Sequence, residues 1–161
     1  MRQGEEIIAA YERHADMVYR IAYVYLKNKA DTEDAVQNTF LKLMERRGAQ
    51  FNSTEHEKAW LIVTVSNHCR NELRRRRKSL VSLKEELVVA PEDKGEHIAV
   101  LEAIMSLPDR CKTVIYLHYY EGYKTEEIAR MLHRPGSTVR SQLSEGRRWL
   151  RNKLGDDFLQ N

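Results

Sequence analysis

Apolar residues recur at steps of three and four along most of this chain, which is the periodicity of helices with one buried face. Over the first half, the pattern predicts three helices, at residues 5–26, 31–44 and 54–78. Three amphipathic helices can bury their apolar faces against one another as a small bundle. The expected core positions are Ile7, Tyr11, Val18, Ala22 and Tyr25 in the first helix, Val36, Phe40, Leu43 and Met44 in the second, and Leu61, Val65, Cys69 and Leu73 in the third.

Residues typical of helix ends stand near the boundaries of these segments. Asp31 is expected to cap the second helix, with further acidic residues in its first turn. Thr54 and Glu57 have the spacing of a capping box at the start of the third helix. The basic tripeptide at residues 27–29 and the Gly-containing one at 46–48 predict the ends of the first two helices.

The periodicity fades over residues 79–95, SLVSLKEELVVAPEDKG, which end in a Pro/Asp/Gly cluster. This composition predicts a flexible linker. A second group of helices follows, one over residues 98–105 and another with Pro108 as its first residue and a stop at Glu121-Gly122. Its expected core positions are Ile98, Leu101, Ile104 and Met105 in the former, and Val114, Ile115 and Leu117 in the latter.

Residues 124–150, KTEEIARMLHRPGSTVRSQLSEGRRWL, predict a helix, a four-residue turn and a second helix. Thr125 is expected to cap the first helix, and residues 133–136 break it because proline lacks an amide hydrogen. Ser137 is expected to cap the second helix, whose apolar stripe is Val139, Leu143, Leu150 and Leu154. Such a unit is typical of helix-turn-helix proteins, which place the second helix in the major groove of duplex DNA.

Composition supports an all-α fold, because 7 Gly and 3 Pro in 161 residues are few for a turn-rich β-protein. We therefore expect two small helical domains, residues 1–78 and 96–161, joined by the linker at 79–95. The net charge of +3 conceals a pattern. Residues 70–78 carry six positive charges and one negative charge, and residues 140–153 carry five positive charges and one negative charge. Between them, residues 84–96 hold five acidic residues and two lysines. Two separate basic segments predict two contacts with a polyanion.

Several classes of chemistry lack support in the sequence. The two cysteines, Cys69 and Cys111, lie in apolar helical patterns without zinc-ligand spacing, so we expect buried, reduced thiols and no metal. No nucleophile–base pair, glycine-rich phosphate loop or carboxylate pair stands out, so no catalytic residue, cofactor or small-molecule substrate is expected. No apolar run approaches ~20 residues and the N-terminus lacks a signal-peptide core, which predicts a cytoplasmic protein.

The third predicted helix has a second, polar face opposite its apolar stripe. Asn and Arg side chains can hydrogen-bond base edges and phosphates, and Trp offers a flat surface for stacking. A solvated helix face is the simplest alternative, and the basic run at residues 74–78 is also compatible with a nuclear-localisation or membrane-surface element. The helix-turn-helix in the second half favours nucleic acid. The polar face comprises Trp60, Thr64, Asn67, Asn71, Arg74 and Lys78.

Three successive stretches carry a resemblance: DTEDAVQNTFLKL, EKAWLIVTVSNHCRNELRRRRK and LPDRCKTVIYLHYYEGYKTEEIARMLHRPGSTVRSQL. In this order they resemble conserved stretches of the extracytoplasmic-function group of bacterial RNA polymerase sigma factors. The resemblance covers almost the whole chain. It implies that the first domain binds core RNA polymerase and recognises the minus-ten promoter element as a melted strand. It also implies that the second domain recognises the duplex minus-thirty-five element.

The resemblance also indicates which residues make these contacts. Core polymerase is expected at Asp34, Gln37, Asn38 and Leu41, and the melted minus-ten strand at Trp60, Asn67, Arg70, Asn71, Arg74 and Arg75. In the duplex-binding helix, Arg140 and Ser141 are expected at bases and Arg147, Arg148 and Arg151 at phosphates. Thr138 and Ser144 are further expected contacts to the minus-thirty-five DNA. Asn71 stands where many members have Asp, which implies a different choice of minus-ten bases.

Two residues of the last helix depart from the family pattern. Glu145 stands at an expected outward position where members commonly have a basic residue, so it should weaken phosphate contact or alter base choice. Gly146 lies inside the helix, where many members have Ala, at a cost of roughly 1 kcal/mol unless close packing requires it.

We therefore predict a sigma factor, with core RNA polymerase and promoter DNA as partners. The resemblance further implies an anti-sigma factor, which in many members is membrane-anchored and would hold the protein at the inner face of the membrane. A free-standing helix-turn-helix regulator that binds duplex DNA as a dimer is an alternative. A membrane-surface or RNA-binding role for the basic third helix is another.

Overall fold

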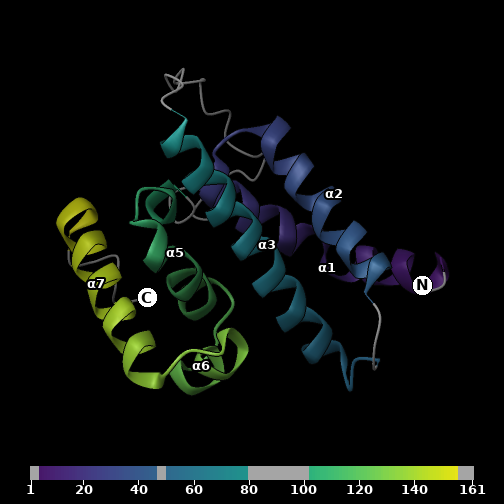
Figure 1. Cartoon of the computed structure of the whole chain (residues 1–161). Helices are drawn as coiled ribbons and strands as arrows, with labels where there is room; N and C mark the ends of the chain where they lie inside the picture. The colour runs from purple at the N-terminus through teal and green to yellow at the C-terminus, as the bar shows by residue number, and fades with distance from the viewer. Residues whose placement is uncertain (1–3, 47–49, 80–101, 156–161) are drawn as a thin grey trace. The chain divides into compact units, whose positions relative to one another are not determined.

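The computed structural model of the chain describes residues 4–46, 50–79 and 102–155, and every regular element in these ranges is a helix (Figure 1). This confirms the predicted all-α class. Two compact units divide at Val89 and Ala90, a position inside the predicted linker. Apart from Ser79 the linker lies outside the described residues, as do the expected core positions Ile98 and Leu101.

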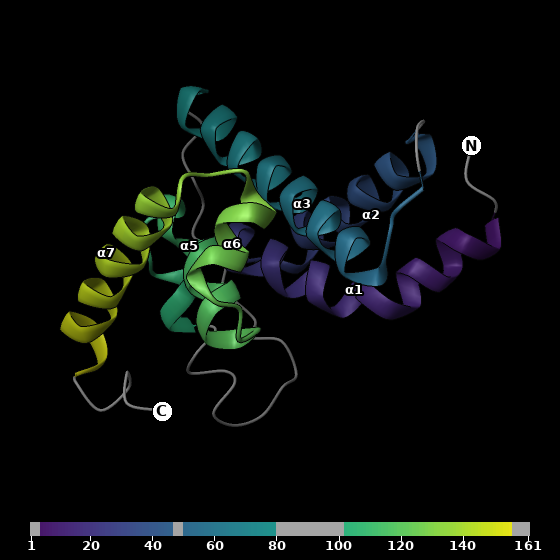
Figure 2. The ribbon, with the colours of Figure 1, turned by 90° about the horizontal axis from the view of Figure 1, so that it is seen from below.

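The first unit is a bundle of α1 (Gly4–Leu26), α2 (Lys29–Glu45) and α3 (Thr54–Lys78), and each helix packs against the other two (Figure 1 and Figure 2). Most of the predicted core is confirmed. The predicted burial of Tyr11 and Met44 is wrong, because their exposed fractions are 50% and 38%. Tyr11 lies at the bundle edge against Phe40, with 5.0 Å between ring centroids. Met44 follows the fully buried Leu43 and is turned about 100° from it around the helix.

The N-termini of α2 and α3 differ from the predicted caps by one to three residues. Asn28, not Asp31, caps α2, and its Oδ1 accepts the Asp31 backbone N–H at 2.9 Å. Ser53 caps α3 by accepting the His56 backbone N–H at 3.1 Å, so Thr54 is the first helical residue. In both cases a neighbouring polar residue satisfies the exposed helix-end donors.

Glu57, predicted to close a capping box, instead is buried between α1 and α3. Its Oε1 accepts a hydrogen bond from Arg13 at 2.8 Å and lies 3.0 Å from His14 Nε2. Burial lowers the pKa of His14, although the Glu57 carboxylate acts in the opposite direction. This polar contact fixes the start of α3 against the middle of α1.

The second unit contains residues 102–105 in a helical turn, α5 (Asp109–Ile115), η1 (Tyr116–Tyr120), α6 (Thr125–Leu132) and α7 (Gly136–Leu154). Pro108 is the N-cap of α5 rather than its first residue. The predicted single helix ends in a π-helical turn, in which the Glu121 N–H bonds Tyr116 O at 3.2 Å. Gly122 then takes a φ of +79°. The core includes Ile104, Cys111, Val114, Ile115, Leu117, Ile128, Val139, Leu143 and Leu150.

Candidate functional site

The polar face of α3 points away from the bundle core. Asn67 and Asn71 are exposed, while Leu61, Val65 and Cys69 are completely buried on the other side of the helix. Asparagine amides both donate and accept hydrogen bonds, so an exposed pair one turn apart can contact base edges. The predicted strand-binding set also includes the half-buried Trp60 and Arg70 and the exposed Arg74 and Arg75.

Trp60 belongs to an aromatic cluster that sequence periodicity did not reveal. Its ring centroid lies 6.0 Å from that of Phe51, and the Arg46 guanidinium lies 4.2 Å from the Phe51 ring centroid. Phe51 also meets the His56 ring edge-on at 5.0 Å. Phe51 stands in the connection between two helices, where no repeating pattern marks it. This cluster holds the Trp60 ring at the start of the polar face.

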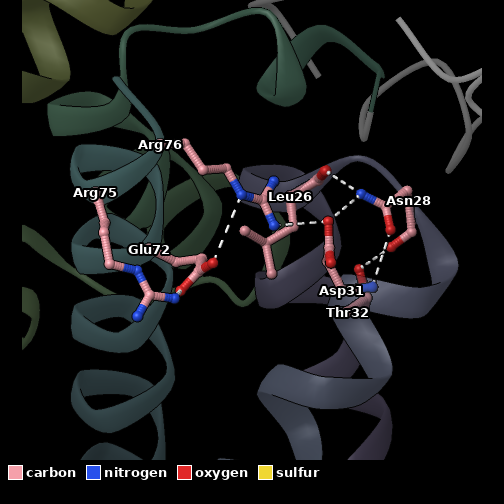
Figure 3. A network of polar contacts seen from close by, with 7 residues as sticks. All are labelled: Leu26, Asn28, Asp31, Thr32, Glu72, Arg75 and Arg76. Atoms are coloured by element: carbon pink, nitrogen blue, oxygen red, sulfur yellow. Dashed lines mark hydrogen bonds and ion pairs between the residues drawn. The ribbon is translucent and has the colours of Figure 1, made fainter. Parts of the chain in front are cut away.

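The basic run at the end of α3 is divided between solvent and the bundle. Arg74 is exposed, and Arg75, with 76% of its side chain exposed, pairs with Glu72. Arg76 is only 26% exposed, and it pairs with Asp31 of α2 at 2.7 Å and with Glu72 at 3.6 Å (Figure 3). Burial alone would raise the pKa of Asp31, but hydrogen bonds from Asn28 and Arg76 outweigh burial and lower it.

The predicted polymerase-binding residues share one face of α2. Their spacing of i, i+3, i+4 and i+7 places them on the same side of a helix, and all are exposed. Leu41 is 51% exposed, whereas the neighbouring Phe40 is buried. The Asn38 amide donates to Asp34 O at 3.0 Å. The face therefore combines acid, amide and apolar groups at Asp34, Gln37, Asn38 and Leu41.

A shallow pocket of about 430 Å³ between α2 and α3 joins these two predicted surfaces. Asp34 and Asn38 line it from α2, and Asn71 and Arg75 line it from α3. The half-buried His68 also lines it, and burial together with nearby Lys42 lowers the pKa of that imidazole. The predicted polymerase and strand contacts are thus neighbours on one surface of the first unit.

In the second unit, α6 and α7 form the predicted helix-turn-helix. Lys124, not Thr125, is the N-cap of α6, and the Glu127 carboxylate accepts the Lys124 backbone N–H at 3.0 Å. His133 ends α6 with a left-handed φ of 53°. Because Pro135 is the N-cap of α7, that helix begins at Gly136, one residue before the predicted Ser137 cap. A left-handed residue followed closely by a proline changes the direction of the chain within three residues, which separates α6 from α7.

The outward face of α7 contains most of its predicted DNA contacts. The Arg140 guanidinium folds back over the helix start, 3.1 Å from where a Cβ on Gly136 would lie. Arg147 differs from the other arginines, because it is half-buried and its Nε donates to Tyr119 Oη at 2.6 Å. The exposed candidates are Thr138, Arg140, Ser141, Ser144, Arg148 and Arg151.

Glu145 is partly exposed at the surface and turns toward α5. It is half-buried against α5, where its carboxylate accepts two hydrogen bonds from Arg110, one of them from Nε at 3.0 Å. These bonds lower the pKa of Glu145. Cys111 Sγ lies 3.5 Å from the same carboxylate, and burial, reinforced by that charge, raises the pKa of the thiol to about 12. The Glu145 charge is therefore already paired with Arg110 of α5.

The described residues include neither a cluster of metal-ligating side chains nor a candidate membrane-spanning helix. Residues 4–46, 50–79 and 102–155 contain no group of three or more His, Cys, Asp or Glu side chains that could hold a metal ion. The helices in the same ranges include none that is long and apolar enough to cross a membrane.

Two family descriptions match the chain, one for each unit. Residues 10–79 match Sigma-70 region 2, and residues 97–150 match Sigma-70, region 4. The first match spans α2 and α3, which carry the polar surfaces described above. The second spans the helix-turn-helix.

Individual relatives agree with these matches. RNA polymerase sigma factor SigV of Bacillus subtilis is 28% identical over 156 residues, covering 95% of this chain and 93% of that protein. ECF RNA polymerase sigma factor SigE of Mycolicibacterium smegmatis is 34% identical, covering 88% of this chain and 59% of that longer protein. The sigma factor RpoE, solved in complex with the anti-sigma factor NepR from Bartonella quintana, shares the fold, with a TM-score of 0.68 at 19% identity and coverage of 95% and 96%.

Proposed function

The chain belongs to the extracytoplasmic-function group of sigma-70 RNA polymerase sigma factors, and from this premise we propose how its surfaces divide the work of promoter recognition. As a sigma factor, the protein binds core RNA polymerase and directs promoter-specific transcription initiation. In this proposal the chemistry of RNA synthesis belongs to the polymerase, and this chain supplies binding energy. The family matches cover whole regions of the chain, so the roles that the resemblance implies for individual residues are argued from the geometry.

The α3 polar face is the proposed contact for the melted minus-ten strand. It offers stacking at Trp60, paired amides at Asn67 and Asn71, and positive charge at its end. Unstacking a base costs a few kcal/mol, and contacts to the exposed base offset that cost without fuel. The observation that carries this assignment is that the amides and Arg74 are exposed on one face whose reverse side is fully buried.

The outward face of α7 is the proposed reader of the minus-thirty-five duplex. Arg140 and Ser141 lie near the start of the helix, where helix-turn-helix proteins contact base edges. Arg148 and Arg151 are exposed farther along and suit phosphates. Arg147 remains a proposed phosphate contact through its terminal nitrogens, because its Nε is occupied by Tyr119.

The α2 face is the proposed contact for core polymerase, and we infer an anti-sigma factor as a further partner. The solved sigma factor with the same fold was found in complex with such a protein. The acidic and apolar residues of 79–95, which suit a docking segment, lie outside the described residues. The alternative of a free-standing duplex regulator accounts for α6 and α7 but leaves the match over residues 10–79 without a role.

Asn67 provides the sharpest test of the proposed strand contact. Asn67→Ala removes an amide that can pair with a base edge and leaves the buried side of α3 intact. We expect reduced opening of ordinary promoters, measured by permanganate reactivity of thymines in the minus-ten element. On templates already mismatched in that element, transcription should recover substantially, because melting is no longer required.

The same variant should leave polymerase association and upstream duplex binding unchanged. Asn152→Ala, which removes an exposed amide from α7, is the matched control and should open promoters normally. Wild-type permanganate reactivity and transcript yield for Asn67→Ala would assign Asn67 to an ordinary solvated helix face. A palindromic footprint formed without polymerase would instead support the free-standing regulator.

A further inference from the structure

Arg76 differs from its neighbours in the basic run because it turns toward α2. Its Nη2 lies 2.7 Å from Asp31 Oδ2, and its Nε lies 3.6 Å from Glu72 Oε1 (Figure 3). Arg74 and Arg75 on the same helix end are exposed. An arginine held by two carboxylates has fewer donors left for a phosphate. Charge counting along residues 74–78 therefore overstates the positive charge available to DNA.

The acceptor for Arg76 is built into the corner between α1 and α2. The Asn28 side chain donates to Asp31 Oδ2 at 2.6 Å and to Leu26 O at 3.1 Å, while its Oδ1 accepts the Asp31 N–H (Figure 3). Thr32 Oγ1 closes the corner by donating to Asn28 O at 2.6 Å. The Asp31 carboxylate is therefore held in one orientation before Arg76 reaches it, which limits the ordering cost of the ion pair.

The location of this ion pair connects the two proposed contact surfaces of the first unit. Asp31 lies one turn before Asp34 on α2, and Arg76 lies just beyond Asn71 on α3. All four residues line the same pocket of about 430 Å³. This ion pair joins α2 to the end of α3 that carries the exposed Arg74 and Arg75.

We propose that Arg76 is a positioning residue, which through its pair with Asp31 fixes the cationic end of α3 against the polymerase-binding helix α2 and does not itself contact DNA. This rests on the proposed function of the two surfaces. A strand drawn across Asn67 and Asn71 continues toward Arg74 and Arg75, so the orientation of the last turns of α3 determines whether these contacts form together.

In the competing interpretation, Arg76 binds a phosphate. The two interpretations predict opposite effects of Asp31→Asn on the DNA interaction. If Arg76 contacts DNA, Asp31→Asn releases it and removes a nearby negative charge, so strand binding should strengthen. If the pair positions α3, Asp31→Asn weakens promoter opening as Arg76→Gln does. Because either substitution alone breaks the same contact, the double variant should be no worse than the single ones.

The experiment uses the full chain assembled with core polymerase. We expect Asp31→Asn and Arg76→Gln each to reduce permanganate-detected opening about fivefold, the upper end of the range for one partly exposed ion pair. Binding to a template mismatched in the minus-ten element should keep its salt slope in Arg76→Gln. Arg74→Gln, which removes a proposed phosphate contact, should lower that slope by about 0.7. Lys29→Gln, which removes an exposed charge beside the pair, should change neither measurement.

Hydrogen exchange of the chain without DNA supplies an independent readout. In Asp31→Asn, amides of residues 72–79 should exchange faster, while those of α1 should not. Unchanged exchange there, stronger binding by Asp31→Asn, or a salt slope lowered equally in Arg76→Gln and Arg74→Gln would each overturn the positioning role. If the wild-type holoenzyme opens no promoter, the proposed function fails instead, and the exchange result still shows whether the pair orders α3.

Discussion

Gly146 lies inside α7, where glycine costs roughly 1 kcal/mol of helix stability relative to alanine. The structure supplies the reason for it: a Cβ at this position would lie 2.5 Å from Ile115 Cγ1 and 3.6 Å from Cys111 Cβ. Both neighbours are completely buried, so neither can move into solvent. Gly146→Ala should destabilise the second unit by about 1 kcal/mol, because overpacking costs about 1–3 kcal/mol and exceeds the gain in helix propensity.

Urea titration of the full chain, followed by hydrogen exchange in α5, measures this change. In an Ile115→Ala background the new methyl group enters vacated space, so Gly146→Ala should there be neutral or stabilising. Asn152→Ala, at an exposed site of the same helix, should stay within about 0.5 kcal/mol of wild type. If Gly146→Ala stabilised the wild-type chain, the Ile115 side chain would be able to move aside without a cost in free energy.

At the scale of the element, α7 has its buried residues and its proposed DNA contacts on different faces. Val139, Leu143 and Leu150 are buried, whereas Arg140 and Arg148 are exposed. Arg140→Ala should therefore cost about 1–3 kcal/mol on the preferred upstream element and relax the choice at one base pair. Arg148→Ala should weaken binding evenly over sequences and lower the salt slope by about one.

Binding to a randomised library of upstream elements, repeated at several salt concentrations, separates these two effects. Both substitutions remove one charge from the same helix, so each is the control for the other. The same sequence profile and the same salt slope in the two variants would refute the division between base and phosphate contacts.

For the whole molecule, the proposed function requires the polymerase to hold a protein whose two units contact different promoter elements. Asp34 and Gln37 are exposed on α2, so replacing both with Arg should leave the bundle folded. The added positive charge should disrupt the charge complementarity of the proposed polymerase contact. The double variant should no longer co-purify with core polymerase, and its circular dichroism should remain helical.

Glu12→Arg, which reverses an exposed charge on α1, is the control and should co-purify normally. Normal co-purification of the α2 double variant would remove this face from the polymerase interface. It would leave the proposed roles of Asn67 and Arg140 intact, because those contacts are measured on DNA.

Periodicity and helix-end chemistry in the sequence determined the helices, most of the buried faces and the helix-turn-helix. These are local properties, since a 3.6-residue repeat or a proline acts within a few residues. The same logic placed the candidate residues of α2 and α3 on exposed faces. The family match confirmed the predicted class of protein, while the roles of individual residues remain predictions.

Only the tertiary structure decided which polar residues form hydrogen bonds or ion pairs with residues distant in the sequence. Glu57 pairs with His14 of α1, Glu145 with Arg110 of α5, and Arg76 with Asp31 of α2. In the sequence each resembles an ordinary capping or surface charge, because its partner lies 35 to 45 residues away. Long-range ion pairs and the space around Gly146 depend on how helices pack, and packing is set by whole faces rather than by any local pattern.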